Sequence, residues 1–221
     1  PWNRKEDIVK PAGPVDHTLG VIKITGKKTG KVTGIIVNFA NHPDTLGDTL
    51  ISADWPGMLR TKLKREFPGV GVLVLNGPSG DINHINPAGT GLRGVEIPDH
   101  IAETLKKKTV QLLKNIKTED SLPIKIYHRK FSLPSRKVSP EELKLAKAVL
   151  KEQGLPSDSL QYMISSSLVQ CAREYSAGRK NYALDINGCS FGNNILILGL
   201  PGELFTTIGM GIKKISPFKY T

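Results

Sequence analysis

Three short apolar runs, rich in β-branched residues, each end in a turn that contains glycine or proline. Each turn presents a side chain that can bind a metal ion or transfer a proton. His42 follows VTGIIVNFA, Asp81 follows VGVLVLN, and Glu203 follows NILILGL. Apolar runs of this length predict buried strands. Because the carboxyl ends of strands form the usual site crevice of an open α/β sheet, we expect these side chains to converge in one pocket.

The remaining pattern alternates strands with helices, and the length of 221 residues fits one large domain. We therefore predict one α/β domain over residues 1–221, with a mixed, largely parallel sheet flanked by helices and a site at the carboxyl ends of the strands. Strands are expected over 19–25, 31–40, 70–75, 123–133, 180–191 and 194–200, and helices over 54–67, 95–117, 139–152, 158–176 and 203–214.

The composition is that of a globular protein, with 38% hydrophobic and 23% charged residues. No apolar stretch approaches the roughly 18 residues that a membrane-spanning helix needs. Cys171 and Cys189 are the two cysteines, and they show no CxxC spacing, so neither a zinc knuckle nor a disulfide framework is indicated. The chain begins at Pro1 without the pattern of a signal peptide, and we expect it to be a piece of a longer chain.

The formal net charge of +11 raises the question of a nucleic-acid partner. The basic residues are scattered, the densest run is Lys106 to Lys108, and aromatic residues for base stacking are few. We therefore expect no specific nucleic-acid partner. A solvated basic surface and attraction to an anionic membrane surface both stay open.

His42 and Glu203 each allow a structural and a functional interpretation. A neutral imidazole is the commonest transition-metal ligand, whereas a lone histidine in a loop is more often ordinary surface. Glu203 follows Pro201-Gly202 and is expected to open a helix, where its carboxylate either caps the N-terminus or serves as a metal ligand or general base. Asp54 is expected to cap the helix over 54–67 or to support the site.

Asp81 ends the glycine-lined loop GPSGD, whose backbone N–H groups could bind an anion or an oxyanion. The loop lacks the Gly-Lys-Ser/Thr ending of a phosphate loop, and the residue two after Ser79 is Asp81 rather than the glycine of a nucleophile elbow. Ser79 is therefore a weak candidate nucleophile. His84 is a candidate ligand or proton shuttle, with a plain polar loop residue as the alternative.

The chain resembles the N-terminal domain of the neutral and alkaline, non-lysosomal ceramidases, a family of zinc-dependent amidases. The resemblance lies in four stretches that follow the family's order and span nearly the whole chain, with little signal over 105–180. These stretches are GPVDHTLGVIKI, VNFANHPDTLGDTLISADWPG, VLNGPSGDINHINP and LILGLPGELFTTIGMGIKKISPFKYT. The combination of NHP, LISAD-x-x-G, NG-x-x-GD and PGE is more specific than any one of them.

The resemblance implies a catalytic α/β domain that is incomplete at both ends and that binds zinc through His42 and Glu203. It also implies that Arg4, in the pair Asn3-Arg4, corresponds to an arginine that acts near the scissile amide. Asp81 and His84 would then orient the glycine loop or move a proton. The implied substrate is a linear amide, such as an N-acylated sphingolipid.

Two departures from the family pattern bear on activity. Asn83 stands where true ceramidases have a serine that takes part in hydrolysis, although a zinc-activated water could still serve as the nucleophile. The family's other histidine ligand precedes the region that matches Pro1, and its tyrosine ligand follows the region that matches Thr221. Because a catalytic zinc site usually has three protein ligands, we expect two to bind zinc more weakly.

The sequence hypothesis is a zinc-dependent hydrolase of an amide bond. One alternative is a non-catalytic module of the same fold that binds lipid or glycan through its basic surface. Another is a hydrolase of a different acyl substrate, because substrate choice depends on the shape of the pocket, which motifs do not report.

Overall fold

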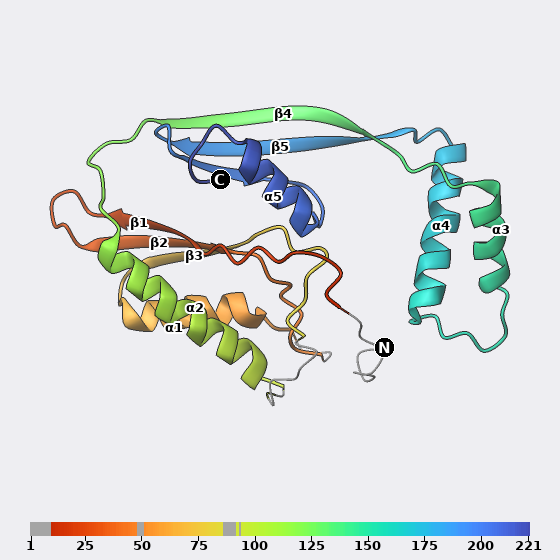
Figure 1. Cartoon of the computed structure of the whole chain (residues 1–221), viewed down its shortest axis with the longest axis horizontal. Helices are drawn as coiled ribbons and strands as arrows, with labels where there is room; N and C mark the ends of the chain where they lie inside the picture. The colour runs from red at the N-terminus through yellow and green to blue at the C-terminus, as the bar shows by residue number, and fades with distance from the viewer. Residues whose placement is uncertain (1–9, 48–50, 86–91, 93) are drawn as a thin grey trace. The chain divides into compact units, whose positions relative to one another are not determined.

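The computed structural model describes residues 10–47, 51–85, 92 and 94–221 (Figure 1). The expected helices and strands are confirmed within a few residues at their ends. They are β1 (Gly20–Thr25), β2 (Val32–Phe39), α1 (Asp54–Glu66), β3 (Gly71–Asn76), α2 (Glu96–Asn115), β4 (Ile124–Pro134), α3 (Pro140–Val149), α4 (Leu160–Ser176), β5 (Asn181–Phe191), β6 (Ile195–Gly199) and α5 (Thr206–Ile215).

The chain divides into two compact units. The first comprises Pro1–Ile126 and Gly188–Thr221, and the second comprises Tyr127–Asn187. The expectation of one catalytic domain over 1–221 stays a prediction. All candidate site residues that the structure describes belong to the first unit.

The strands form two three-stranded sheets, in the orders β1-β2-β3 and β4-β5-β6. Strands β1 and β2 pair antiparallel, whereas β2 and β3 pair parallel from Gly34↔Gly71 to Phe39↔Asn76. The prediction of a mixed α/β fold is confirmed, but the prediction of a largely parallel sheet was wrong, because the pairing is mostly antiparallel. The reason is that a short turn joins β1 to β2 and another joins β5 to β6, and only antiparallel neighbours can be connected so briefly.

The core of the first unit lies between the β1-β2-β3 sheet and the helices α1 and α2, which cover one face of this sheet (Figure 1). Strand β2 alternates its side chains, so that Ile35 and Val37 point to this face. The buried residues that form this core cluster are Ile35, Val37, Trp55, Leu59, Leu63, Val70, Ala102, Leu105 and Leu113. The spacing of Trp55, Leu59 and Leu63 is that of one helix face, which explains why α1 forms and how it packs.

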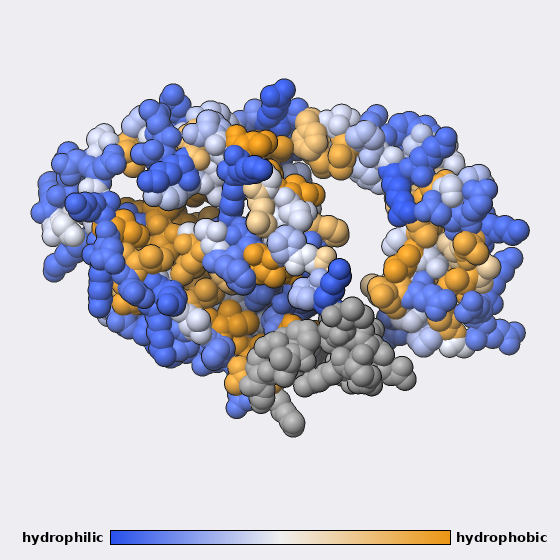
Figure 2. All heavy atoms as spheres, viewed as in Figure 1, coloured by the Kyte–Doolittle hydropathy of each residue, from blue (hydrophilic) through white to orange (hydrophobic). Residues whose placement is uncertain are grey.

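The second unit contains the helices α3 and α4, which pack against each other. Helix α3 begins with the expected capping box: Glu142 N donates to Ser139 Oγ at 3.1 Å, and Ser139 N donates to Glu142 Oε2 at 2.9 Å. Several apolar side chains of the pair stay exposed (Figure 2). Among the exposed apolar residues of these helices are Leu145 and Leu160, at 67% and 69%. Among the described helices, none has the length and apolar character needed to cross a membrane.

A partly buried ion pair joins the segment before β1 to α5. Lys213 Nζ donates to Asp16 Oδ2 at 2.7 Å, and Thr18 N donates to Asp16 Oδ1 at 3.0 Å. Burial by itself raises the pKa of the Asp16 carboxyl, but the hydrogen bonds from Lys213 and Thr18 outweigh it, and the pKa lies below its ordinary value of 3.8. The ionised carboxylate therefore stabilises the folded chain.

We predict that Asp16→Asn lowers the free energy of unfolding at pH 7 by about 1.5–3 kcal/mol, because charge-assisted hydrogen bonds are lost. A folded-state pKa below 3.8 means that the stabilisation is present above this pH and disappears as the pH falls through the folded-state value. Denaturant titrations at pH 7 and pH 3 should therefore show a larger loss at pH 7. Asp120→Asn, at an exposed position, is the control. Equal losses from Asp16→Asn at both pH values would contradict the prediction.

Candidate functional site

The loops that follow β2 and β3 begin side by side, because these strands are parallel and end in register. Gly77 N donates to Phe39 O at 3.0 Å, and Asn41 N donates to the side-chain oxygen of Asn76 at 3.3 Å. The Asn76 amide also donates to Ser79 Oγ at 3.0 Å. These bonds join the loop that carries His42 to the loop that carries Asp81.

Asp54 fixes the loop that carries His42. Its carboxylate accepts from Thr45 N at 2.9 Å, from Thr45 Oγ1 at 2.9 Å and from Leu46 N at 3.2 Å, and both Asp54 and Thr45 are buried. The expected capping role was wrong, since Ala53 occupies the N-cap of α1 and Asp54 follows it with a φ of 48°. A non-glycine residue in this left-handed region is strained, and the hydrogen bonds to the loop offset that strain.

The glycine loop, residues 77–81, lies against the backbone of residues 203–206. Gly80 N donates to Leu204 O at 2.9 Å. Asp81 Oδ1 accepts from Thr206 N at 2.6 Å and from Thr206 Oγ1 at 2.9 Å. The bond from the Thr206 backbone N–H is the main reason why the pKa of Asp81 lies below its ordinary value. The carboxylate of Asp81 thus holds the segment that carries Glu203.

This arrangement corrects the expectation that Glu203 opens the last helix. Helix α5 begins at Thr206, and Phe205 at its N-cap provides no side-chain hydrogen bond. Asp81 satisfies the first backbone N–H of α5 from a different loop. Glu203 precedes the helix and its side chain is 79% exposed, so its carboxylate is not used for capping.

Four ionisable side chains surround the point where these loops meet. His42 Nε2 lies 3.6 Å from Glu203 Oε2, and His42 Nδ1 lies 3.7 Å from Asp44 Oδ1. The same oxygen of Asp44 lies 3.5 Å from His84 Nδ1. The Nδ1 atoms of His42 and His84 are buried and have no hydrogen-bond partner. The structure thus brings together His42, Glu203 and His84, and it adds Asp44.

The pair of His42 and Glu203 fits two ligands of one zinc ion. Zinc–ligand bonds of about 2.0–2.2 Å in tetrahedral geometry place two ligand atoms roughly 3.3 Å apart, close to the 3.6 Å between these side chains. Imidazole nitrogen and carboxylate oxygen are also the ligand types that zinc accepts. Within the described ranges, however, no group of three or more such side chains is arranged to hold a metal ion.

The other predicted residues have different positions. Arg4 lies outside the described residues. Asp81 is hydrogen-bonded to Thr206, an arrangement that fits the orienting part of its expected role, and its part in catalysis stays a prediction.

Sequence reasoning missed Asp44, although it follows His42 by two positions in the same turn. It also missed Gly209, where a Cβ atom would lie 2.5 Å from Pro78 Cγ, so that α5 packs directly on the glycine loop.

The fold is similar to that of neutral ceramidases of known structure. The crystal structure of neutral ceramidase from Pseudomonas aeruginosa matches with a TM-score of 0.60 and 15% sequence identity, over 99% of this chain and 41% of that chain. A ceramidase complexed with C2 gives the same TM-score and identity, over 96% of this chain and 40% of that chain. No protein-family model and no curated protein sequence matches the chain. The likeness supports a ceramidase-like fold, and the chain spans about two-fifths of these ceramidases.

We predict that Gly80→Ala is destabilising by about 1–3 kcal/mol. An added Cβ would lie 2.4 Å from the backbone oxygen of Glu203, so the segment that carries Glu203 would have to move. Gly13→Ala is the matched control, because a Cβ there meets nothing within 4 Å. Denaturant titrations and backbone amide NMR shifts of residues 203–206 measure the effect. Equal stability and unchanged shifts in Gly80→Ala would contradict the close approach.

Proposed function

We propose that this chain carries part of the metal site of a zinc-dependent hydrolase that cleaves the amide bond of an N-acylated lipid. The observation that carries the proposal is the approach of His42 Nε2 to Glu203 Oε2, 3.6 Å apart although they come from loops far apart in the sequence. The ceramidase-like fold and the four sequence stretches that resemble the family support the choice of reaction.

The residues of this chain have distinct parts in the proposed reaction. A bound zinc ion would polarise the scissile carbonyl and acidify a water molecule. His42 and Glu203 bind the ion, and Asp81 keeps Glu203 in place through Thr206. His84 is proposed to accept or return a proton, and Arg4 is proposed to stabilise the negative charge that develops on the carbonyl oxygen.

Asn83 affects the choice of nucleophile. Its side-chain oxygen accepts a hydrogen bond from Ile85 N at 3.3 Å, so the amide helps to order the loop. A carboxamide is not a nucleophile comparable to a serine hydroxyl. The proposed reaction therefore uses water as the nucleophile and requires no side-chain hydroxyl at this position.

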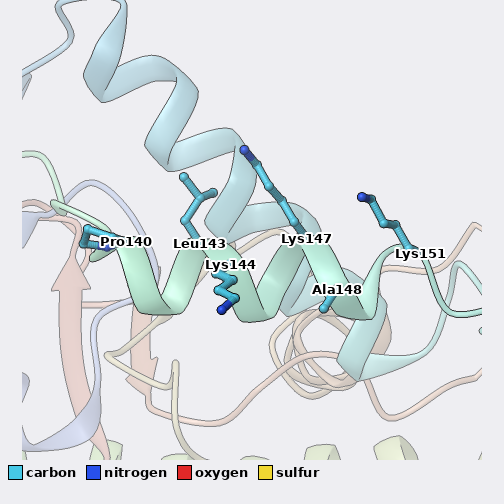
Figure 3. A pocket seen from close by; sticks show the side chains of 6 residues that line it. All are labelled: Pro140, Leu143, Lys144, Lys147, Ala148 and Lys151. Carbon is cyan, nitrogen blue, oxygen red and sulfur yellow. The ribbon is translucent and has the colours of Figure 1, made fainter.

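The second candidate function is binding to an anionic lipid surface without catalysis. It is favoured by the net charge of +11 and by a hollow of about 520 Å³ on α3 that is lined by Lys144, Lys147 and Lys151 (Figure 3). Leu143 and Ala148, which line the same hollow, would add apolar contact with the bilayer. Hydrolysis of another acyl substrate is a variant of the first proposal, with the same metal site and a different pocket.

We predict that the full-length protein, which includes the ligands expected outside this chain, binds about one zinc ion per chain. Its His42→Ala/Glu203→Ala variant is expected to bind none. The measurement is elemental analysis after zinc loading and desalting, together with hydrolysis of a fluorogenic N-acylated sphingolipid. His17→Ala/Glu119→Ala, which removes the same side-chain types at exposed positions, is the control and should keep both zinc and activity.

The outcomes separate the candidates. Zinc that stays in the His42→Ala/Glu203→Ala variant would overturn the ligand assignment. If the double variant loses both the bound zinc and the hydrolysis of the lipid amide, the ligand assignment is supported. Salt-sensitive binding to phosphatidylserine vesicles that survives the double variant, with no hydrolysis by the intact protein, would favour the binding function.

A further inference from the structure

The side chain of Asp44 lies between two imidazole rings from different loops. Its Oδ1 atom is 3.7 Å from His42 Nδ1 and 3.5 Å from His84 Nδ1. Both of these nitrogen atoms are buried and lack a hydrogen-bond partner. Asp44 itself is half exposed, at 51% of its side-chain surface, so its carboxylate can rotate.

The two nitrogen atoms of His42 face different groups. Nδ1 faces Asp44, and Nε2 faces Glu203. In a neutral imidazole one nitrogen carries the proton and the other carries the lone pair, and the hydrogen bond made by one nitrogen decides which. A carboxylate only accepts, so Asp44 favours the proton on Nδ1 of His42, whereas Glu203 favours it on Nε2 while no cation lies between them. If Nε2 and Glu203 shared a metal ion, Nε2 would supply its lone pair and the proton would stay on Nδ1, facing Asp44.

The backbone around Asp44 is held in place, which makes a defined orientation possible. Thr45, the next residue, is buried and binds the Asp54 carboxylate through both its N–H and its hydroxyl group. Pro43 restricts the backbone on the other side. The loop therefore presents Asp44 from a fixed position, although the carboxylate itself is exposed.

We propose that Asp44 is a positioning residue that accepts a hydrogen bond from Nδ1–H of His84, and from Nδ1–H of His42 when a metal ion is bound at His42 Nε2 and Glu203. The separations of 3.5 and 3.7 Å are longer than a hydrogen bond, and a rotation of the carboxylate closes them. Metal-binding histidines commonly donate their second N–H to a carboxylate. The part of the proposal that concerns His42 rests on the proposed function, whereas the tautomer of His84 does not.

The first test is long-range ¹H–¹⁵N NMR of the metal-free intact protein at pH 8, where ordinary imidazoles are neutral. His42→Gln and His84→Gln spectra assign the two rings. We expect the Nδ1–H form for His84 in the unchanged protein and a shift of His84 towards Nε2–H in Asp44→Asn. Asp185→Asn is the matched control, because it removes the same charge from another His–Asp pair, His128 Nε2 and Asp185 Oδ1 at 2.5 Å. An Nε2–H form of His84 in the unchanged protein, or no change of His84 in Asp44→Asn, would overturn the proposal.

The second test is zinc affinity, measured by competition with a chromogenic chelator. We expect Asp44→Asn to bind zinc about 10–100-fold more weakly than the unchanged protein. We also expect partial rescue in Asp44→Glu and unchanged affinity in Asp185→Asn. If the unchanged protein binds zinc and Asp44→Asn binds it equally well, Asp44 has no positioning role and the metal site stands. If the unchanged protein binds no zinc, the proposed function fails, and the tautomer measurement alone decides the role of Asp44.

Discussion

The close approach between the glycine loop of residues 77–81 and the backbone of residues 203–206 is the contact on which the site depends. It needs a residue without a side chain at position 80, because a Cβ there would lie 2.4 Å from the Glu203 carbonyl oxygen. It also needs Gly209, which lets α5 pack on Pro78. Without these two glycines, Glu203 would lie farther from the end of β2 and from His42.

Two carboxylates complete the framework, and both act on backbone groups rather than on a ligand. Asp54 binds the N–H groups of residues 45 and 46 and so holds the loop of His42. Asp81 binds the N–H group of Thr206 and so holds the segment of Glu203. The hydrogen bonds of Asp54 and Asp81 therefore fix the backbone near His42 and Glu203. The side chains of His42 and Glu203 are not needed for this positioning.

The stretches that resemble ceramidases contain these contacts. LISADWPG includes Asp54, NGPSGD includes Gly80 and Asp81, and LPGELFTTIGMG includes Glu203, Thr206 and Gly209. Each of these residues is restricted by a close backbone approach or by a hydrogen bond to a distant segment. The sequence signal is therefore concentrated where the backbone of the site is constrained, and it is weak over 105–180, which includes the α3–α4 pair.

Local sequence determined the elements of this protein. Helix and strand positions follow from apolar periodicity and from turn residues, which act over a few positions, and they agree with the structure. The meeting of His42 and Glu203 was expected from strand ends that gather in one sheet. Strands β2 and β6 belong to different sheets, and the contact between residues 77–81 and 203–206 brings the two side chains together instead. Tertiary structure alone decided the division into two mostly antiparallel sheets, since periodicity does not specify which strands pair. It alone revealed Asp44 between two imidazoles. It also showed that Asp54 binds the loop of residues 45 and 46 and that Asp81 binds the first N–H group of α5, because these partners come from packing of segments that the sequence pattern does not connect.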